Sequence, residues 1–255
     1  MLLELRSVSR RFGGLLAVAD LSMTVTKGTI HGLIGPNGAG KTTVFNLISG
    51  VVPVTTGEIL FRGERISGLR PSQICRRGLA RTFQATSLFT EYTVLENLLV
   101  ASQLLTGNGL RRALIPSAAH RRTERAARAG AQALLASVEL DRCAGHTAAQ
   151  LPHCDQKALS LAMALATGAE LLLLDEPMAG LAARETQRTM DLLRRLRDGG
   201  KTVLLVEHDM RAVMELCDVI TVLDHGVRIA EGRPRAIQED RAVIEAYLGA
   251  DERSA

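Results

Sequence analysis

The sequence is poor in aromatic residues and contains no tryptophan. Its 255 residues include 2 tyrosines and 5 phenylalanines, so that 3% of the chain is aromatic. Surfaces that stack nucleic-acid bases depend on such side chains. The net charge of +4 is also too small to indicate nucleic-acid binding without a localised basic patch. We therefore expect no nucleic-acid partner.

The chain also has few cysteines and no long apolar run. Cys75, Cys143, Cys154 and Cys217 form no C-x-x-C pair, which favours free thiols in a reducing compartment over a disulfide framework or a zinc site. No apolar run approaches the roughly 18 residues that span a bilayer. The first residues lack the basic flank and apolar core of a signal peptide. If a membrane is involved, we expect a partner to supply the span.

What is present is an ordinary globular composition, 46% hydrophobic and 23% charged. Strand-like and helix-like segments alternate, which is typical of an α/β fold whose largely parallel sheet is covered by helices. The first part of the chain predicts strands at residues 2–9, 21–25, 29–34 and 57–63 and a helix at 41–50.

Strand signals are few between about residues 70 and 151, where helices are predicted at 71–77, 93–105 and 121–137. This change predicts a helical subdomain inserted into the α/β core. The core pattern then returns, with strands at 170–175, 202–206, 219–223 and 227–230 and helices at 184–197 and 209–217. The His225-Gly226 pair predicts a tight turn between the last two strands.

A basic segment lies within the region of predicted helices. It contains six arginines and one acidic residue, Glu124. Two interpretations stay open: a solvated helix face, or a docking surface for acidic lipid head groups or a partner. The arginines are Arg111, Arg112, Arg121, Arg122, Arg125 and Arg128.

Residues 35–42, Gly-Pro-Asn-Gly-Ala-Gly-Lys-Thr, fit the phosphate-binding loop pattern between a predicted strand and a predicted helix. Glycines let backbone N–H groups converge on phosphate oxygens, and the following helix presents the positive end of its dipole. Lys41 can reach the β- and γ-phosphates, and Thr42 can ligate Mg²⁺. The predicted nucleotide-binding residues here are Gly35, Pro36, Asn37, Gly38, Ala39, Gly40, Lys41, Thr42 and Thr43.

Two acidic residues end a second buried strand. Asp175 and Glu176 directly follow the apolar run 171–174. Asp175 suits the Mg²⁺ shell, and Glu176 can polarise the attacking water, because phosphoryl transfer to water needs a positioned acceptor near the γ-phosphate.

With these two motifs the sequence resembles the ATP-binding subunits of ABC transporters over residues 2–249. The resemblance includes Gln84 in Arg-Thr-Phe-Gln, His208 in Val-Glu-His-Asp, and Phe12. It implies a P-loop NTPase core of the ABC-ATPase type with an N-terminal antiparallel β portion. It also implies a helical, membrane-facing subdomain inserted at about residues 85–155 of a single domain 1–249, followed by a polar tail at 250–255.

The resemblance also implies roles for these residues. Gln84 would couple the nucleotide and Mg²⁺ to a transmembrane subunit, His208 would contact the γ-phosphate, and Phe12 would stack on adenine. The expected cofactors are ATP and Mg²⁺. The expected catalytic residues are Glu176, His208 and Gln84, and the expected metal-binding residues are Thr42, Gln84 and Asp175.

Within this family the chain resembles the ATPase subunits of branched-chain amino-acid importers. The markers are Arg-Phe-Gly-Gly, Val-Glu-His-Asp-Met, Ile-Ala-Glu-Gly-Arg-Pro and residues 243–249. The implied partners are transmembrane permease subunits, a second ATP-binding subunit in a heterodimer or homodimer, and indirectly an external substrate-binding protein. The implied location is peripheral, on the cytoplasmic face of the inner membrane. Importers of urea or other amides have closely similar subunits, so the cargo stays open between these classes.

The sequence departs from the family in the signature segment, usually Leu-Ser-Gly-Gly-Gln and here residues 151–156, Leu-Pro-His-Cys-Asp-Gln. Pro152 removes a hydroxyl and a backbone N–H, and Cys154 adds a side chain where glycine allows close approach. Branched-chain-type subunits sometimes share the proline and aspartate, so Cys154 is the sharper departure. Ala182 and Ala183 stand where the family usually offers a polar residue to a dimer interface.

Several interpretations of these departures stay open. The changes are tolerated in a working importer, or they make the two ATP sites of a dimer unequal, with hydrolysis mainly at this chain's own P-loop. A third hypothesis is a regulatory subunit that holds ATP with little hydrolysis. A fourth is a soluble ABC-type ATPase acting on nucleic acid or ribosomes, which the single cassette and small net charge do not favour.

Overall fold

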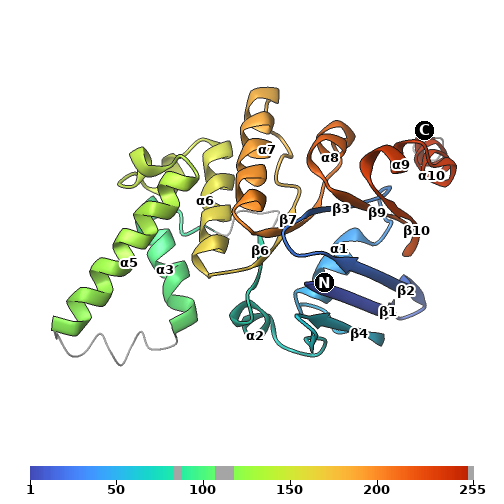
Figure 1. The fold of residues 1–255 in the computed structure, drawn as a ribbon, viewed down its shortest axis with the longest axis horizontal. Helices are drawn as coiled ribbons and strands as arrows, with labels where there is room; N and C mark the ends of the chain where they lie inside the picture. Colours follow the sequence, from blue (N-terminus) through green and yellow to red (C-terminus); the bar gives the residue numbers. More distant parts are fainter. Residues whose placement is uncertain (83–87, 107–117, 252–255) are drawn as a thin grey trace. The chain divides into compact units, whose positions relative to one another are not determined.

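The computed structural model describes residues 1–82, 88–106 and 118–251 (Figure 1). The chain forms two compact units, the first made of residues 1–81 with 170–255 and the second of residues 82–169. The predicted helical insertion at about 85–155 lies within the second unit, which continues to residue 169.

The first unit begins with a four-stranded sheet in the order β2-β1-β4-β5. Its strands are antiparallel, as predicted for the N-terminal portion. The second strand begins at Leu15, earlier than the predicted start at residue 21, because the hairpin turns directly after Phe12 through Gly13 and Gly14. The strands are β1 (Leu3–Phe12), β2 (Leu15–Val25), β4 (Thr56–Phe61) and β5 (Glu64–Arg65).

A six-stranded sheet in the order β10-β9-β3-β8-β7-β6 forms the rest of this unit's β structure. Strand β3 pairs in parallel with β8 and β9, β7 pairs in parallel with β8, and β9–β10 is the predicted hairpin with positive φ at His225 and Gly226. The strands are β3 (Ile30–Ile34), β6 (Leu79–Thr82), β7 (Leu171–Asp175), β8 (Thr202–Val206), β9 (Val219–Asp224) and β10 (Val227–Gly232).

The helices of the first unit include α1 between its two sheets (Figure 1). Val44, Phe45 and Ile48 of α1 share one apolar core with residues of both sheets, so the core fixes the helix that follows the P-loop. The helices are α1 (Lys41–Ile48), α2 (Pro71–Arg76), α7 (Ala183–Asp198), α8 (Met210–Leu216), α9 (Pro234–Gln238) and α10 (Arg241–Asp251). Helix α10 runs past the predicted cassette end at residue 249.

The second unit is helical in its described residues apart from the end of β6 and a single bridge between Thr93 and Thr147. Arg122, Arg125 and Arg128 are exposed on α5, whereas Arg111 and Arg112 lie outside the described residues. Both interpretations of the basic segment stay predictions. The elements are α3 (Val94–Thr106), α5 (Ala118–Ser137), the 3₁₀ turns Asp141–Cys143 and Ala148–Gln150, and α6 (His153–Ala166).

The predicted α/β class is confirmed, and most predicted elements are present with small shifts of their ends. Helix α6, which the sequence analysis did not predict, begins directly after Pro152. Within the described part of the chain, no helix is both long and apolar enough to cross a bilayer. No disulfide joins the four cysteines, all of which the structure describes.

Candidate nucleotide-binding site

Three neighbouring parallel strands end at the same edge of the larger sheet, and each is followed by predicted site residues. The P-loop follows β3, Asp175 ends β7 with Glu176 after it, and His208 comes two residues after the end of β8. In open α/β sheets this carboxyl edge is where ligands bind. The topology therefore gathers the predicted phosphate-binding and acidic residues into one region.

The P-loop has the backbone conformation that its glycines permit. Gly35, Gly38 and Gly40 have φ angles of 149°, 80° and 99°, a region that side chains disfavour. A Cβ atom on Gly35 would lie 2.0 Å from the carbonyl oxygen of Leu223. On its outer side the loop is held by the β9–β10 turn, because Gly226 N–H donates to the Ala39 carbonyl at 3.0 Å.

Lys41 is buried at the start of α1, with 6% of its surface exposed. Its Nζ donates to the carbonyl oxygens of Gly35 at 2.7 Å and Pro36 at 2.9 Å. Burial lowers the pKa of Lys41, and the nearby charges of Glu176 and Asp175 oppose that shift. The ammonium group of Lys41 is therefore hydrogen-bonded to carbonyl groups of the P-loop itself and lies near two carboxylates.

Asp175 is 7% exposed and pairs with a cation that the sequence analysis did not single out. Arg81, at the end of β6, donates from Nη2 to Oδ2 of Asp175 at 2.9 Å. Its Nη1 donates to Oδ1 of Asn46 at 2.7 Å and to Oγ of Ser49 at 3.3 Å. Arg81 thus ties the acidic strand end to α1.

The donor set fits a magnesium ion. Thr42 presents an exposed hydroxyl at the first turn of α1, and Asp175 presents a carboxylate close enough to Lys41 for its charge to oppose the lowering of the Lys41 pKa. Oxygen donors of this kind are what Mg²⁺ prefers, with few protein ligands and with substrate phosphates and water completing the shell. Among the described residues, no group of three or more His, Cys, Asp or Glu side chains forms a metal cage. A site completed by phosphate is consistent with that finding.

Glu176 and His208 meet directly. Nε2 of His208 lies 2.9 Å from Oε1 of Glu176, and an ionised carboxylate only accepts hydrogen bonds, so the proton belongs on Nε2. Glu176 has a φ of 50°, which is uncommon for a residue other than glycine. Its N–H donates to the Val206 carbonyl at 2.9 Å, which holds this turn against the end of β8.

Phe12, the predicted adenine-stacking residue, is 43% exposed at the end of β1. The ring is therefore not part of the hydrophobic core. The guanidinium of Arg10 lies 4.4 Å from the centre of its ring, which makes a cation–π contact. Gln84 lies outside the described residues, so its predicted role stays a prediction.

The comparisons with known proteins agree with this geometry. A family model for ABC transporters matches residues 18–179, and a model for the branched-chain amino acid ATP-binding cassette transporter matches residues 227–253. The protein BraF of Pseudomonas aeruginosa, a high-affinity branched-chain amino acid transport ATP-binding protein, is 42% identical over 97% of this chain and 98% of its own. The chain belongs to the ABC transporter family.

Other relatives in this family support the same assignment. LivG of Escherichia coli K12, a high-affinity branched-chain amino acid transport ATP-binding protein, is 43% identical over 97% of this chain and 98% of its own. The ADP conformation of MJ1267, an ATP-binding cassette of an ABC transporter, matches with a TM-score of 0.83 at 30% identity, covering 97% and 98% of the two chains. These findings confirm the predicted family and the predicted ABC-ATPase fold.

The ABC signature segment belongs to the second unit. Pro152 is the N-cap of α6, and His153, Cys154 and Asp155 form the helix's first turn. The Cys154 thiol lies 3.7 Å from Oδ1 of Asp155, and Gln156 donates to the Leu151 carbonyl at 3.0 Å. Proline is tolerated before the first helical turn because the first N–H groups have no partner within the helix, although Pro152 makes no side-chain cap hydrogen bond. The segment is therefore a regular helix start despite its departure from the usual family sequence.

The other departure, at Ala182, also lies at a helix start. Ala182 is the N-cap of α7, and its N–H donates to Oε2 of Glu185 at 2.9 Å. In helix capping, an Asn or Asp side chain at the cap position accepts N–H groups of the first turn. Glu185 instead accepts the N–H of the cap residue itself, while the methyl group at position 182 accepts no N–H of the first turn.

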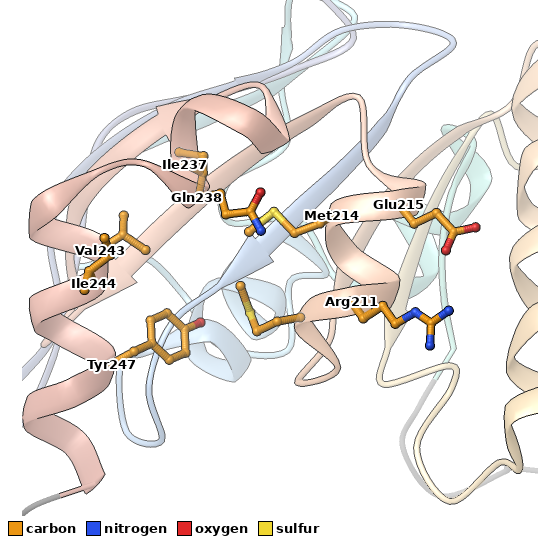
Figure 2. Close-up of a pocket in the computed structure, with 9 residues that line it drawn as sticks. Arg211, Met214, Glu215, Ile237, Gln238, Val243, Ile244 and Tyr247 are labelled. Carbon is orange, nitrogen blue, oxygen red and sulfur yellow. The ribbon is translucent and has the colours of Figure 1, made fainter.

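The C-terminal helix contacts the P-loop, a relation that the sequence analysis did not predict. The backbone of Gly35 hydrogen-bonds the Tyr247 hydroxyl, while burial raises the pKa of Tyr247 to about 12. Figure 2 shows Tyr247 and Met214 turned into a groove between α8 and α10, with Arg211 and Glu215 pointing away from it. The groove has a volume of about 730 Å³. Residues 243–249, which serve as a family marker, therefore include a side chain that supports the P-loop.

Sequence reasoning missed two further residues beside the site, Arg81 and Glu207. Glu207 is a buried carboxylate, 3% exposed, that accepts the backbone N–H of Met178. Both residues stand inside recognised motifs, Arg-Thr-Phe-Gln and Val-Glu-His-Asp. A charged residue at the end of an otherwise apolar strand was the available signal, because such a group is buried only with a partner.

Proposed function

We propose that this ABC protein binds and hydrolyses Mg-ATP to drive import of branched-chain amino acids through partner membrane subunits. The observation that carries the proposal is the 42–43% identity to BraF and LivG over 97% of the chain. The P-loop, the Asp175–Arg81 pair and the Glu176–His208 pair support it, because they provide the parts that ATP hydrolysis needs. The similarity to BraF and LivG does not favour the alternative that this chain serves an importer of urea or another amide.

In this proposal the P-loop binds the phosphates. Its N–H groups and the N-terminus of α1 stabilise negative charge, and Phe12 stacks on adenine. Lys41 exchanges its hydrogen bonds with the Gly35 and Pro36 carbonyls for phosphate oxygens. The exchange requires little further loss of water, because burial has already removed most of the water around the Lys41 ammonium group. Asn37, Gly38, Ala39 and Gly40 supply the turn around the phosphates.

Thr42 and Asp175, together with Gln84, would hold Mg²⁺, which would supply positive charge beside the negatively charged phosphates. Glu176 accepts a hydrogen bond from the attacking water. His208 orients Glu176 through the 2.9 Å contact, and His208 then contacts the γ-phosphate. Hydrolysis therefore relies on positioning and electrostatics, without a covalent intermediate.

The partners in this proposal are permease subunits in the membrane, served by an external substrate-binding protein, and a second ATP-binding subunit. The solved post-hydrolysis state of MJ0796, bound to ADP and Pi, is a dimer, with a TM-score of 0.75 to this chain at 25% identity. We place this chain on the cytoplasmic face of the inner membrane, as a peripheral subunit.

Pro152, Cys154 and Ala182 favour an unequal pair of ATP sites in a heterodimer. In a head-to-tail dimer this chain's P-loop and Glu176 are completed by the partner's signature segment, and the altered segment here faces the partner's ATP. Hydrolysis then occurs mainly at this chain's own P-loop. Inactivating the P-loop lysine of the partner should leave most transport intact, while Lys41→Ala should abolish it. The opposite pattern would reverse the assignment.

Uptake by the complete transporter tests the proposed substrate. The complex of this chain with its permease and ATPase partners is reconstituted in vesicles, and uptake of leucine, isoleucine, valine and urea is measured with the substrate-binding protein present. We expect ATP-dependent uptake of the three amino acids and none of urea, with the Lys41→Ala complex as the inactive control. Uptake of urea in preference to leucine would contradict the proposed substrate class while leaving the ATPase assignment intact.

A further inference from the structure

Glu207 is a buried carboxylate directly after the end of β8, and each of its two oxygens accepts a backbone N–H. Its side chain is 3% exposed. One oxygen, Oε1, accepts the backbone N–H of Met178 at 2.6 Å, and the other, Oε2, accepts the backbone N–H of His208 at 3.1 Å. Burying a carboxylate is strongly unfavourable unless its oxygens are hydrogen-bonded, and charge-assisted bonds from N–H groups provide that compensation.

The two donors belong to the two turns that carry the hydrolytic side chains. Met178 follows Glu176 in the turn after β7, and His208 begins the turn after β8. The side chains of Glu176 and His208 meet at 2.9 Å. One buried carboxylate therefore joins the backbones of two turns whose functional side chains are in contact.

The turn at Glu176 needs such support. A φ of 50° is unfavourable for a residue with a side chain and persists only where neighbouring contacts enforce it. On one side, the Glu176 N–H is held by the Val206 carbonyl at 2.9 Å. On the other side, the Met178 N–H is held by Glu207. The turn is thus fixed at both ends by the end of β8 and the residue after it.

We propose that Glu207 is a positioning residue for ATP hydrolysis, which holds the Glu176 turn and the His208 turn in register. Its carboxylate binds the backbones of these turns, so its effect on the reaction passes through Glu176 and His208. The inference rests on the proposed function, in particular on the hydrolytic role of Glu176. A neutral glutamine of the same shape cannot replace it, because its amide has one acceptor and one donor group facing two N–H donors.

The decisive variant is Glu207→Gln in the purified transporter complex. We expect kcat for ATP hydrolysis to fall about 10- to 100-fold, because small misplacements of catalytic groups lower the rate by such factors. The KM for ATP and the directly measured ATP affinity should stay within about threefold, because the lost interaction serves the chemical step alone. The matched control is Glu239→Gln, which should leave kcat unchanged. Glu239 is an exposed acid at the end of α9, where it pairs with Arg235.

Two further variants separate the outcomes. Glu207→Asp keeps the charge but is one methylene shorter, so it reaches one donor and should give an intermediate kcat. If Glu207→Gln does not fold, Glu207→Asp decides: lowered kcat at normal ATP affinity supports the proposal, and normal kcat overturns it. A lower melting temperature with normal kcat per ATP-binding molecule would mean that Glu207 only stabilises the fold, which overturns the proposal.

Glu176→Gln is measured beside these variants. If Glu176→Gln is inactive while Glu207→Gln has normal kcat, the inference about Glu207 fails and the proposed function stands. If Glu176→Gln hydrolyses ATP normally, the proposed hydrolytic role itself fails, and with it the role of Glu207. The two failures are therefore distinguishable.

Discussion

The guanidinium of Arg81 donates to the carboxylate of Asp175 at 2.9 Å, and the side chains are only 7% and 6% exposed. The pair joins β6 to β7 in the first unit, and through Asn46 it also joins α1. A buried ion pair of this kind is weak evidence of net stabilisation, but removing one partner leaves the other buried without its counter-charge. The pair is therefore a sensitive point for both stability and the proposed Mg²⁺ site.

Arg81→Met tests this pair. We expect the free energy of unfolding to fall by about 3 to 5 kcal/mol, because the Asp175 carboxylate stays buried without its hydrogen-bonded cation. Urea unfolding measures the change. The control is Arg241→Met, which removes an exposed helix pair with Glu245 and should change stability by less than about 1 kcal/mol. Equal effects of the two substitutions would show that the Arg81–Asp175 pair is not structurally important.

We expect His31 to make the free energy of unfolding depend on pH. It is buried in β3, its Nε2 lies 2.8 Å from the Thr221 hydroxyl, and that hydroxyl donates to Glu231 at 2.9 Å. Burial lowers the pKa of His31 to about 4, and the charge of Glu231 opposes the shift. The unfolded chain therefore binds a proton near pH 6.5 that the folded chain excludes until about pH 4.

Stability should accordingly be lost as the pH falls from about 6.5 towards 4, with a contribution of about 3 kcal/mol from this residue over the whole interval. The measurement is urea unfolding at a series of pH values for the natural chain and for His31→Gln. The difference between the two should shrink as the pH falls. The exposed His225→Gln is the control, and the same pH profile in all three proteins would contradict the assignment to His31.

Gly35 tests the conformation of the P-loop. A methyl group at this position would lie 2.0 Å from the Leu223 carbonyl, whereas at Gly63, with a φ of 77°, it would meet nothing within 4 Å. Gly63→Ala thus reports the backbone strain alone, about 1 to 2 kcal/mol. We expect Gly35→Ala to lose more stability than that and to weaken ATP binding at least about tenfold. Calorimetry measures the unfolding and the ATP binding of both variants. Equal stability and equal ATP affinity of Gly35→Ala and Gly63→Ala would contradict the prediction, because they would show that the P-loop adapts to the methyl group.

Phe12 tests the proposed adenine contact. Stacking of a base on an aromatic ring contributes about 1 to 3 kcal/mol, so Phe12→Ala should weaken ATP binding while leaving the affinity for inorganic triphosphate unchanged. Leu15→Ala, at an exposed position of the same hairpin, is the matched control. Loss of affinity for both ligands would indicate a general effect on the P-loop and contradict base stacking.

The local motifs of this protein could be predicted from the sequence, because the chemistry of each is contained in a few consecutive residues. The P-loop spacing, the apolar run ending in Asp175 and Glu176, and the turn at His225 all lie where they were expected. Alternation of strand and helix patterns was sufficient for the α/β class.

What escaped prediction depends on contacts between distant residues or on an ambiguous local signal. Arg81 donates to side chains 32, 35 and 94 residues away in the chain, and Glu207 accepts from a residue 29 away. One sequence carries no information on such pairs. Helix α6 was missed because residues 151–156 were interpreted as a degenerate signature segment, although proline is also tolerated directly before a helix.

The most direct test of the proposed hydrolysis is Mg-ATP turnover by the purified transporter complex that contains this chain and its partner ATPase subunit, with ATP binding measured in parallel, for the natural sequence, Glu176→Gln and Cys154→Gly. We expect turnover by the complex with the natural chain, and for Glu176→Gln normal ATP binding with turnover lowered about 100-fold or more. Cys154→Gly would raise turnover if the altered signature segment limits it. Normal turnover by Glu176→Gln would contradict the proposed hydrolytic role of Glu176.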